Sequence, residues 1–186
     1  MDILDFVNSI TPLPPSSKAM LFHVFKLVRY PKGHLLLQEH RRSHKAYFIK
    51  QGVLHAYVCK EGKPVTYWIG MEGNVVYPSQ LYSDNGEYGN VELLEDSALY
   101  ELDLNRLQQL FSDDIHLANW GRIAAEKACV SLEKAMISRQ FNTTLRRYEE
   151  LINEYPEIVR RVPIYIIAFY LNTSPENLSR IRARIK

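Results

Sequence analysis

Residues 163–185, with the sequence PIYIIAFYLNTSPENLSRIRARI, are the stretch that decides the fold. Its first part predicts a short helix whose apolar face consists of Ile164, Ile167, Ala168 and Leu171. Asn172 can adopt the left-handed conformation that ends a helix, Ser174 can cap the next helix, and Pro175 suits that helix's first turn. Two short helices joined by such a turn make a helix-turn-helix pattern.

The second helix of this pattern is polar and basic on its outer side. Its inward face is expected to consist of Leu178, Ile181 and Ile185. Its outward positions are Glu176, Asn177, Arg180, Arg184 and Lys186. Arginine can donate two hydrogen bonds to guanine, glutamate can accept one from cytosine, and serine and asparagine suit phosphate groups. The stretch therefore favours DNA binding, and the alternative is an ordinary helical hairpin with a basic surface.

Charge is spread unevenly along the chain. Residues 139–186 contain nine Lys and Arg against five Asp and Glu, a net charge of +4, whereas the remaining residues sum to −2. A basic segment on a nearly neutral body fits an anionic partner. A solvated helix end, where cations complement the helix dipole, would give the same pattern.

Upstream of this segment, residues 25–102 alternate short runs rich in Val, Ile, Tyr and Phe with turn signals. The runs are residues 25–30, 34–38, 46–50, 53–59, 65–69, 75–77, 88–94 and 98–102. Strands of this length and spacing predict an antiparallel sandwich or barrel, and Lys60-Glu-Gly-Lys63 predicts a tight hairpin turn.

From Asp103 onward the hydrophobic period becomes helical, and a long helix is predicted over about residues 113–138. The apolar and small residues on one side of it are Leu117, Trp120, Ala124, Ala128, Ser131 and Ala135. The fold class is therefore α+β, with a β domain and long helix over residues 1–138, a helical domain over residues 139–186, and a hinge at Ser138–Asn142.

Three segments resemble the Crp/Fnr family of bacterial transcription regulators. They are YFIKQGVL at residues 47–54, KEGK at residues 60–63, and VPIYIIAFYL with TSPENLSRI at residues 162–171 and 173–181. The resemblance covers nearly the whole chain and implies a jelly roll of the cyclic-nucleotide-binding type, a long dimerisation helix and a C-terminal helix-turn-helix.

The resemblance also implies roles for individual residues. Glu176 and Arg180 would read base edges, Ser174 and Asn177 would touch phosphates, and Arg184 completes the DNA-binding set. The dimer interface would run along the long helix through Leu117, Trp120, Ala124 and Ala128. The implied partners are double-stranded DNA and a second copy of the chain, and RNA polymerase is a further candidate.

The chain departs from the family at the effector pocket. Tyr77-Pro78 and Glu87-Tyr88 stand where cyclic-nucleotide binders carry a Gly-Glu pair and an arginine pair. A glutamate would repel a cyclic phosphate and the two tyrosines would crowd the pocket, so cyclic AMP is not expected. The residues that would line a surviving pocket for a different effector are Tyr77, Pro78, Gln80, Glu87 and Tyr88.

Two further departures concern DNA and redox chemistry. Pro175 replaces a base-reading arginine, and the chain ends at Lys186, so the β-hairpin wing is expected to be shortened or absent. With no N-terminal cysteine cluster, an iron–sulfur centre is not expected. Cys59 and Cys129 are far apart and match no disulfide or metal spacing.

Other classes of protein are disfavoured. The histidines of the β region, His34, His40, His44 and His55, lack the His-x-His spacing of a cupin metal site and suggest scattered surface residues. No nucleophile elbow, P-loop or carboxylate pair is present, so an enzyme is not expected.

No secretory signal or transmembrane run occurs, and a cytoplasmic location is expected. The alternative function is a ligand-sensing or protein-interaction module that no longer binds DNA.

Overall fold

The structure is a computed structural model that describes residues 2–79 and 86–185. Two helices, α1 (Ile3–Ile10) and α2 (Pro15–His23), precede the β region. The strands are β1 (Phe25–Tyr30), β2 (Leu35–Leu37), β3 (Lys45–Gln51), β4 (Leu54–Lys60), β5 (Lys63–Gly70), β6 (Val75–Val76), β7 (Asn90–Leu93) and β8 (Ser97–Asp103). All eight correspond to predicted runs, and Lys60 pairs with Lys63 across the predicted hairpin turn.

The strands form two antiparallel four-stranded sheets with the orders β1-β8-β3-β6 and β2-β7-β4-β5. In both sheets, strands that are distant in the sequence lie side by side, which is the jelly-roll arrangement that was predicted. The prediction of a barrel needs a correction, because the sheets are not closed. Within the described residues, β1 and β2 each pair on one side only, with β8 and β7, so each sheet keeps a free edge.

The strand β3 is buried on both of its faces. Tyr47 and Ile49 point between the two sheets, whereas Ala46 and Phe48 point outward and are covered by the N-terminal helices. The interior between the sheets consists of Leu36, Leu37, Tyr47, Ile49, Leu54, Ala56, Val76, Val91, Leu93 and Leu99. A strand buried on both sides reads as a continuous apolar run rather than an alternation.

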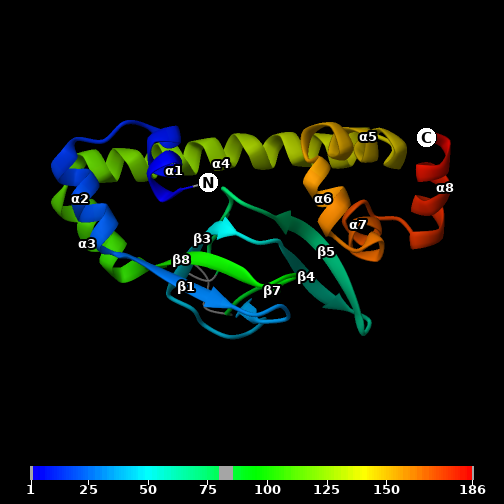
Figure 1. The fold of residues 1–186 in the computed structure, drawn as a ribbon, viewed down its shortest axis with the longest axis horizontal. Helices are drawn as coiled ribbons and strands as arrows, with labels where there is room; N and C mark the ends of the chain where they lie inside the picture. The colour runs from blue at the N-terminus through cyan, green and yellow to red at the C-terminus, as the bar shows by residue number, and fades with distance from the viewer. Residues whose placement is uncertain (1, 80–85, 186) are drawn as a thin grey trace.

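The helices after the sheets are α3 (Leu104–Asp113), α4 (Ile115–Phe141), α5 (Thr144–Glu154), α6 (Pro156–Arg161), α7 (Ile164–Tyr170) and α8 (Pro175–Ile185). Asp114 caps α4 by accepting hydrogen bonds from the backbone N–H groups of His116 and Leu117. Figure 1 shows α4 running along the molecule above the sheets, with α1 and α2 around its first half and α5–α8 at its far end.

The long helix includes most of the segment Ser138–Asn142, which was predicted as a hinge. It continues to Phe141, and Asn142 is its C-terminal cap. The Ser138 hydroxyl and the Asn142 side-chain amide both donate hydrogen bonds to the Glu150 carboxylate of α5, at 2.9 and 2.8 Å. The chain therefore changes direction at Asn142, and the division into domains at residue 138 stays a prediction.

Candidate nucleic-acid interface

The turn between α7 and α8 has the geometry that the sequence predicts. Asn172 has a φ of 55°, in the left-handed region. Its backbone N–H donates to the Phe169 carbonyl at 3.0 Å, and that of Thr173 donates to the Ala168 carbonyl at 2.9 Å. These bonds satisfy carbonyls at the end of α7 that would otherwise lack partners.

Ser174 and Asn177 stabilise the start of α8. The Ser174 hydroxyl oxygen accepts from the Asn177 backbone N–H at 3.2 Å, as an N-cap does. The Asn177 side-chain amide donates to the Thr173 hydroxyl at 2.8 Å. Both side chains, predicted to touch phosphates, are thus engaged in holding the turn, and their contact with DNA stays a prediction.

The inward face of α8 is shorter than predicted. Leu178 is fully buried and Ile181 is 9% exposed, and both belong to the apolar cluster around α7. Ile185, which was predicted to be inward, is 41% exposed. It lies in the last turn of α8, beyond the residues that form this cluster.

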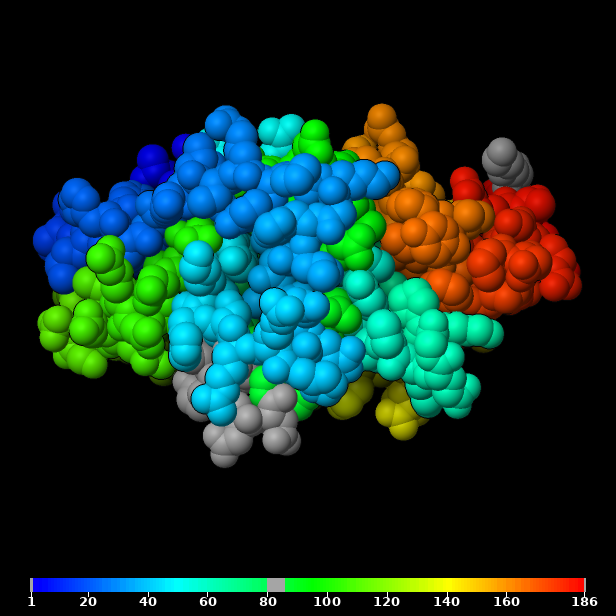
Figure 2. All heavy atoms as spheres, turned by 90° about the horizontal axis from the view of Figure 1, so that it is seen from below, coloured from blue at the N-terminus to red at the C-terminus, as the bar shows by residue number. Residues whose placement is uncertain are grey.

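The outer face of α8 carries arginines that are free to bind an anion. Arg180 and Arg184 are exposed, Arg182 is half-buried, and none of the three forms an ion pair within residues 2–79 and 86–185. Other arginines of the C-terminal helices are paired, as Arg160 is with Glu157 at 2.8 Å. Figure 2 shows α8 in red forming one end of the molecule, where its outer face is open.

Glu176 is ionised and exposed at the start of α8. Its own backbone N–H and the Ser174 hydroxyl hydrogen-bond to the carboxylate, and the charge of Arg180 adds to this, so the pKa of Glu176 lies below its usual range. A carboxylate held in the charged form accepts hydrogen bonds and repels phosphate, so it suits a base edge with a donor such as cytosine N4.

Arg147 of α5 positions the turn between α7 and α8, and no sequence pattern singles it out. Its guanidinium donates to the carbonyls of Leu171 and Tyr170, both at 3.1 Å, and so ties α5 to the end of α7. Burial, with a contribution from the charge of Arg139, lowers the pKa of Arg147. On a helix with four other charged residues, the sequence does not distinguish an arginine that binds carbonyls from a solvated one.

The predicted dimer stripe on α4 is partly wrong. Leu117 is fully buried and Trp120 is 6% exposed, both within the protomer. The Trp120 indole N–H donates to the Val7 carbonyl at 3.0 Å, and its ring meets that of Phe6 edge-on. These two residues hold α1 against α4, so they are not available to a partner, whereas Ala124 is partly buried and Ala128 is exposed.

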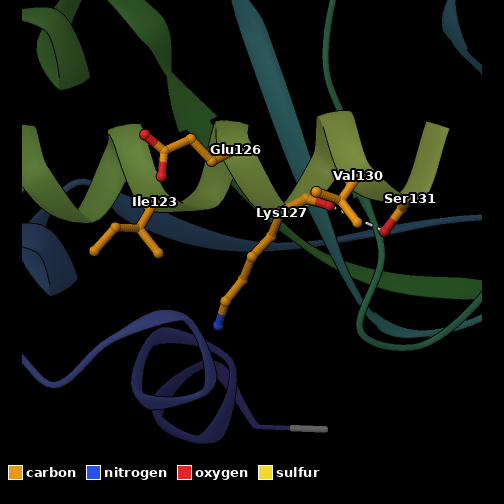
Figure 3. A pocket seen from close by; sticks show the side chains of 5 residues that line it. All are labelled: Ile123, Glu126, Lys127, Val130 and Ser131. Carbon is orange, nitrogen blue, oxygen red and sulfur yellow. Dashed lines mark hydrogen bonds between the residues drawn. The ribbon is translucent and has the colours of Figure 1, made fainter. Parts of the chain in front are cut away.

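The second half of α4 is uncovered. Every side chain from Ala125 to Ile137 is exposed. The large apolar ones in and just after this segment are Val130, Leu132, Met136, Ile137 and Phe141, which are 50–73% exposed. Figure 3 shows the neighbouring hollow beside α1, into which Lys127 reaches. The Lys127 ammonium donates to the carbonyls of Ser9 and Ile10 at the end of α1, both at 2.8 Å.

No protein-family model and no curated protein matches the chain. Solved structures do match it. One is the global regulator CLP of Xanthomonas campestris, described as responsive to c-di-GMP, with a TM-score of 0.70, 14% identity, and 92% of this chain and 91% of that one covered. Another is a putative Crp/Fnr transcriptional regulator from Eubacterium rectale, with a TM-score of 0.69, 15% identity and coverage of 93% and 85%.

A third is FixK2 from Bradyrhizobium japonicum, with a TM-score of 0.68, 18% identity and coverage of 87% and 84%. The similarity extends over the jelly roll, the long helix and the C-terminal helices together. The chain has the Crp/Fnr fold. At these identities the similarity establishes the fold, and the activity has to be argued from the site.

Within this Crp/Fnr fold, the residues predicted to line an effector pocket separate into two groups. Glu87 and Pro78 are buried. Tyr77 and Tyr88 are 50% and 62% exposed, so they lie at the surface and do not fill a pocket as expected. Gln80 lies outside the described residues.

Glu87 is held by the loop that precedes it. Its Oε2 accepts hydrogen bonds from the backbone N–H and the hydroxyl of Ser79, at 2.9 and 2.7 Å. Its backbone N–H donates to the Arg41 carbonyl and its carbonyl accepts from the His40 N–H. Its Oε1 is buried and has no partner among the described residues. A negatively charged carboxylate at this buried position would repel an anionic phosphate placed beside it.

The histidines of the β region do not form a metal site. Among the residues that the structure describes, no group of three or more His, Cys, Asp or Glu could hold a metal ion. His40 and His44 are exposed as predicted. His55 was expected at the surface but is 7% exposed, with Nδ1 3.2 Å from the Thr66 hydroxyl and its ring against that of Tyr57.

The buried His55 predicts acid sensitivity. Burial lowers its pKa to about 4, from 6.5, because the charged form is disfavoured inside the protein. Between these two values the unfolded chain binds more protons than the folded one, so stability is complete above about pH 6.5 and falls as the pH drops towards 4. We expect a loss of about 1–2 kcal/mol from this group, measured by urea unfolding at several pH values. In His55→Gln the free energy of unfolding should fall less steeply between pH 6.5 and 4. If it falls as steeply as in the natural chain, the pH dependence does not come from His55.

The described part of the chain contains no helix that is both long and apolar enough to cross a membrane.

Proposed function

We propose that the protein is a DNA-binding transcription regulator that acts as a homodimer and reads the major groove with α8. The observation that carries this proposal is the outer face of α8, where arginines without ion pairs follow a well-capped helix start at an open end of the molecule. The Crp/Fnr fold of the chain supports it, because the solved neighbours include proteins described as regulators.

Each exposed side chain of α8 has a role in this proposal. Arg180 donates two hydrogen bonds to guanine, and Glu176 accepts one from cytosine N4. Arg184 contributes charge near the phosphate backbone, which dominates affinity for DNA. Ser174, Asn177 and the N-terminus of α8 approach phosphates, where backbone N–H groups favour an anion.

The uncovered half of α4 supports dimerisation. Every side chain of this segment is exposed, so the segment packs little against its own chain apart from the bonds of Lys127 to α1. Long helices in proteins depend on packing for most of their stability. Its large apolar side chains are expected to meet the same segment of a second copy, in place of Leu117 and Trp120. Such a dimer would set its two α8 helices about 34 Å apart, to meet successive turns of the major groove.

The remaining parts of the proposal concern the effector, location and partners. The buried carboxylate of Glu87 disfavours cyclic AMP, so the effector is another small molecule or none. We propose that the protein is not an enzyme, that it works in the cytoplasm, and that RNA polymerase is a candidate partner. The second candidate function, a sensing or interaction module without DNA binding, is favoured by Ser174 and Asn177, whose side chains are engaged within the turn.

The test that separates the two functions is binding to randomised duplex DNA, followed by fluorescence anisotropy over a salt series. A regulator is expected to select a palindromic site and to lose affinity steeply as salt rises, because it releases the counterions of the phosphates that it contacts. A folded dimer that does not bind at low salt would contradict DNA binding and support the module.

A further inference from the structure

One arginine joins the C-terminal helices to two turns of the jelly roll. Arg161, the last residue of α6, donates from Nη1 and Nη2 to both oxygens of Glu72, at 2.9 and 2.8 Å. It also donates to Glu95, from Nη2 and, at 3.4 Å, from Nε. Glu72 follows β5 and Glu95 lies between β7 and β8, so one guanidinium joins two turns of the jelly roll to the helical unit.

We propose that Arg161, Glu72 and Glu95 form an ionic latch that fixes the orientation of the helix-turn-helix unit on the jelly roll, and with it the direction that α8 faces. The orientation part of this proposal stands on the contacts alone. Its consequence for DNA binding rests on the proposed function.

One carboxylate of the latch, that of Glu72, is also positioned by a bond that does not involve Arg161. Glu72 Oε1 also accepts from the backbone N–H of Gly52, at 2.8 Å. Gly52 has a φ of 132°, which favours glycine, and a Cβ at this position would lie 2.1 Å from the Ser97 hydroxyl oxygen. Glycine therefore lets the backbone at residue 52 lie close to Ser97. A bidentate arginine that meets a fixed carboxylate has a defined direction, which a looser ion pair lacks.

The remaining contact between the helical unit and the jelly roll is mostly apolar, and Arg139 of α4 adds a hydrogen bond to the Tyr67 carbonyl of β5 and lies over the ring of Tyr170. Val53 and Ile69 of the jelly roll pack in one apolar cluster with Ile166, Ile167 and Leu171. Burial of apolar surface is favourable but non-directional, so these contacts tolerate small rotations of the helical unit. The bonds from Ser138 and Asn142 to Glu150 hold the other end of the unit, and two fastened points leave it little freedom to rotate.

Glu72 and Arg161 stay charged near neutral pH. Burial alone would raise the pKa of Glu72, but the hydrogen bonds from Arg161 and Gly52 outweigh burial and lower the pKa to about 2. The same carboxylates raise the pKa of Arg161 above its ordinary value. The latch is therefore expected to respond to competing ions and to substitution, and to be insensitive to pH near neutrality.

The test is a distance measurement between spin labels on the jelly roll and on α8, with no DNA present. One label goes on the natural, exposed Cys59 of β4, and the other on Ala183→Cys, on an exposed position of α8, in a Cys129→Ser background. An excess of unlabelled chain ensures that distances within one chain dominate. We expect a single narrow distribution for the latched protein.

Arg161→Met keeps the aliphatic stem and removes the guanidinium, and it should broaden or shift this distribution. Arg160→Met is the matched control, because Arg160 is the preceding residue of α6 and, among the described residues, its ion pair is with the half-buried Glu157 of the same helix. If Arg161→Met does not fold, Glu72→Gln with Glu95→Gln provides the same test. A folded latch variant whose distribution equals that of the control overturns the proposal.

Binding to the selected duplex then tests the consequence for DNA. We expect Arg161→Met to bind roughly fivefold more weakly or worse, because α8 must be reoriented before it binds. If neither the parent chain nor the variants bind DNA, the proposed function fails, whereas the distance distributions still decide the latch.

Discussion

Replacing Leu132 and Ile137 of α4 with glutamate is expected to convert the protein from a dimer to a monomer and to lower its affinity for a palindromic duplex by roughly 100-fold or more. Within one chain these side chains are 70% and 50% exposed, so the substitutions remove little packing from the protomer. Leu132 and Ile137 lie roughly 140° apart around α4, so at least one of the new carboxylates would lie in the apolar contact of a symmetric dimer. There it would be near its counterpart, and burial and repulsion would both oppose association.

The loss of affinity follows from the geometry of a two-site contact. A dimer presents two α8 helices, and once one is bound the other meets its half-site at a high effective concentration. A monomer has a single α8 and loses this advantage, although the side chains that read the bases are unchanged. Sedimentation velocity measures the first effect and fluorescence anisotropy the second.

The matched control is Ile115→Glu on the same helix. Ile115 is 69% exposed and begins α4, far from the uncovered segment, and an acidic residue there complements the helix dipole. This variant should remain a dimer and bind DNA as the natural chain does. A dimer that persists in Leu132→Glu with Ile137→Glu would place the contact elsewhere than on this half of α4.

The fold was predictable from the sequence wherever local chemistry determines structure. The turn at Asn172 and the cap at Ser174 depend on backbone and side-chain atoms only a few residues apart, and both have the predicted geometry. The eight strands were located by runs of β-branched and aromatic residues between turn signals. These signals lie within single elements, so they do not require knowledge of the tertiary contacts.

The predictions that were wrong concern which side of a helix or strand is buried, and by which other part of the chain. The apolar stripe that includes Trp120 has the spacing of a dimer contact, but α1 of the same chain covers its first half. An apolar stripe shows that a helix face is covered and does not show by what. His55 was assigned to the surface for a similar reason, since nothing in its own strand reveals the packing around it.

The residues that position α8 were missed because their partners are backbone carbonyls and distant carboxylates. Arg147 binds the carbonyls of Tyr170 and Leu171, and Arg161 binds two turns of the jelly roll. Periodicity places both arginines among charged neighbours, where a solvated role is the natural interpretation. Only the tertiary arrangement separates Arg161 from Arg160, whose partner Glu157 lies one turn away on the same helix.

Arg180 is the residue whose removal should reduce sequence recognition the most. Its side chain is exposed on α8 and forms no ion pair within the described residues, so it can meet a base edge. Loss of a bidentate contact to guanine costs about 1–3 kcal/mol for each half-site and relaxes selectivity at that base. The matched control is Arg29→Ala, which removes the same charge from an exposed position on β1.

The central claim is that α8 reads DNA, and fluorescence anisotropy on the selected duplex tests it most directly. The natural chain, Arg180→Ala and Arg29→Ala are compared at several salt concentrations, each against the selected site and a scrambled one. The account predicts that Arg180→Ala loses roughly 30-fold or more in affinity for the selected palindrome, because each of the two half-sites loses about 1–3 kcal/mol, and that it discriminates less between the two duplexes, whereas Arg29→Ala behaves like the natural chain. An Arg180→Ala chain that binds as tightly and as selectively as the natural one would contradict it.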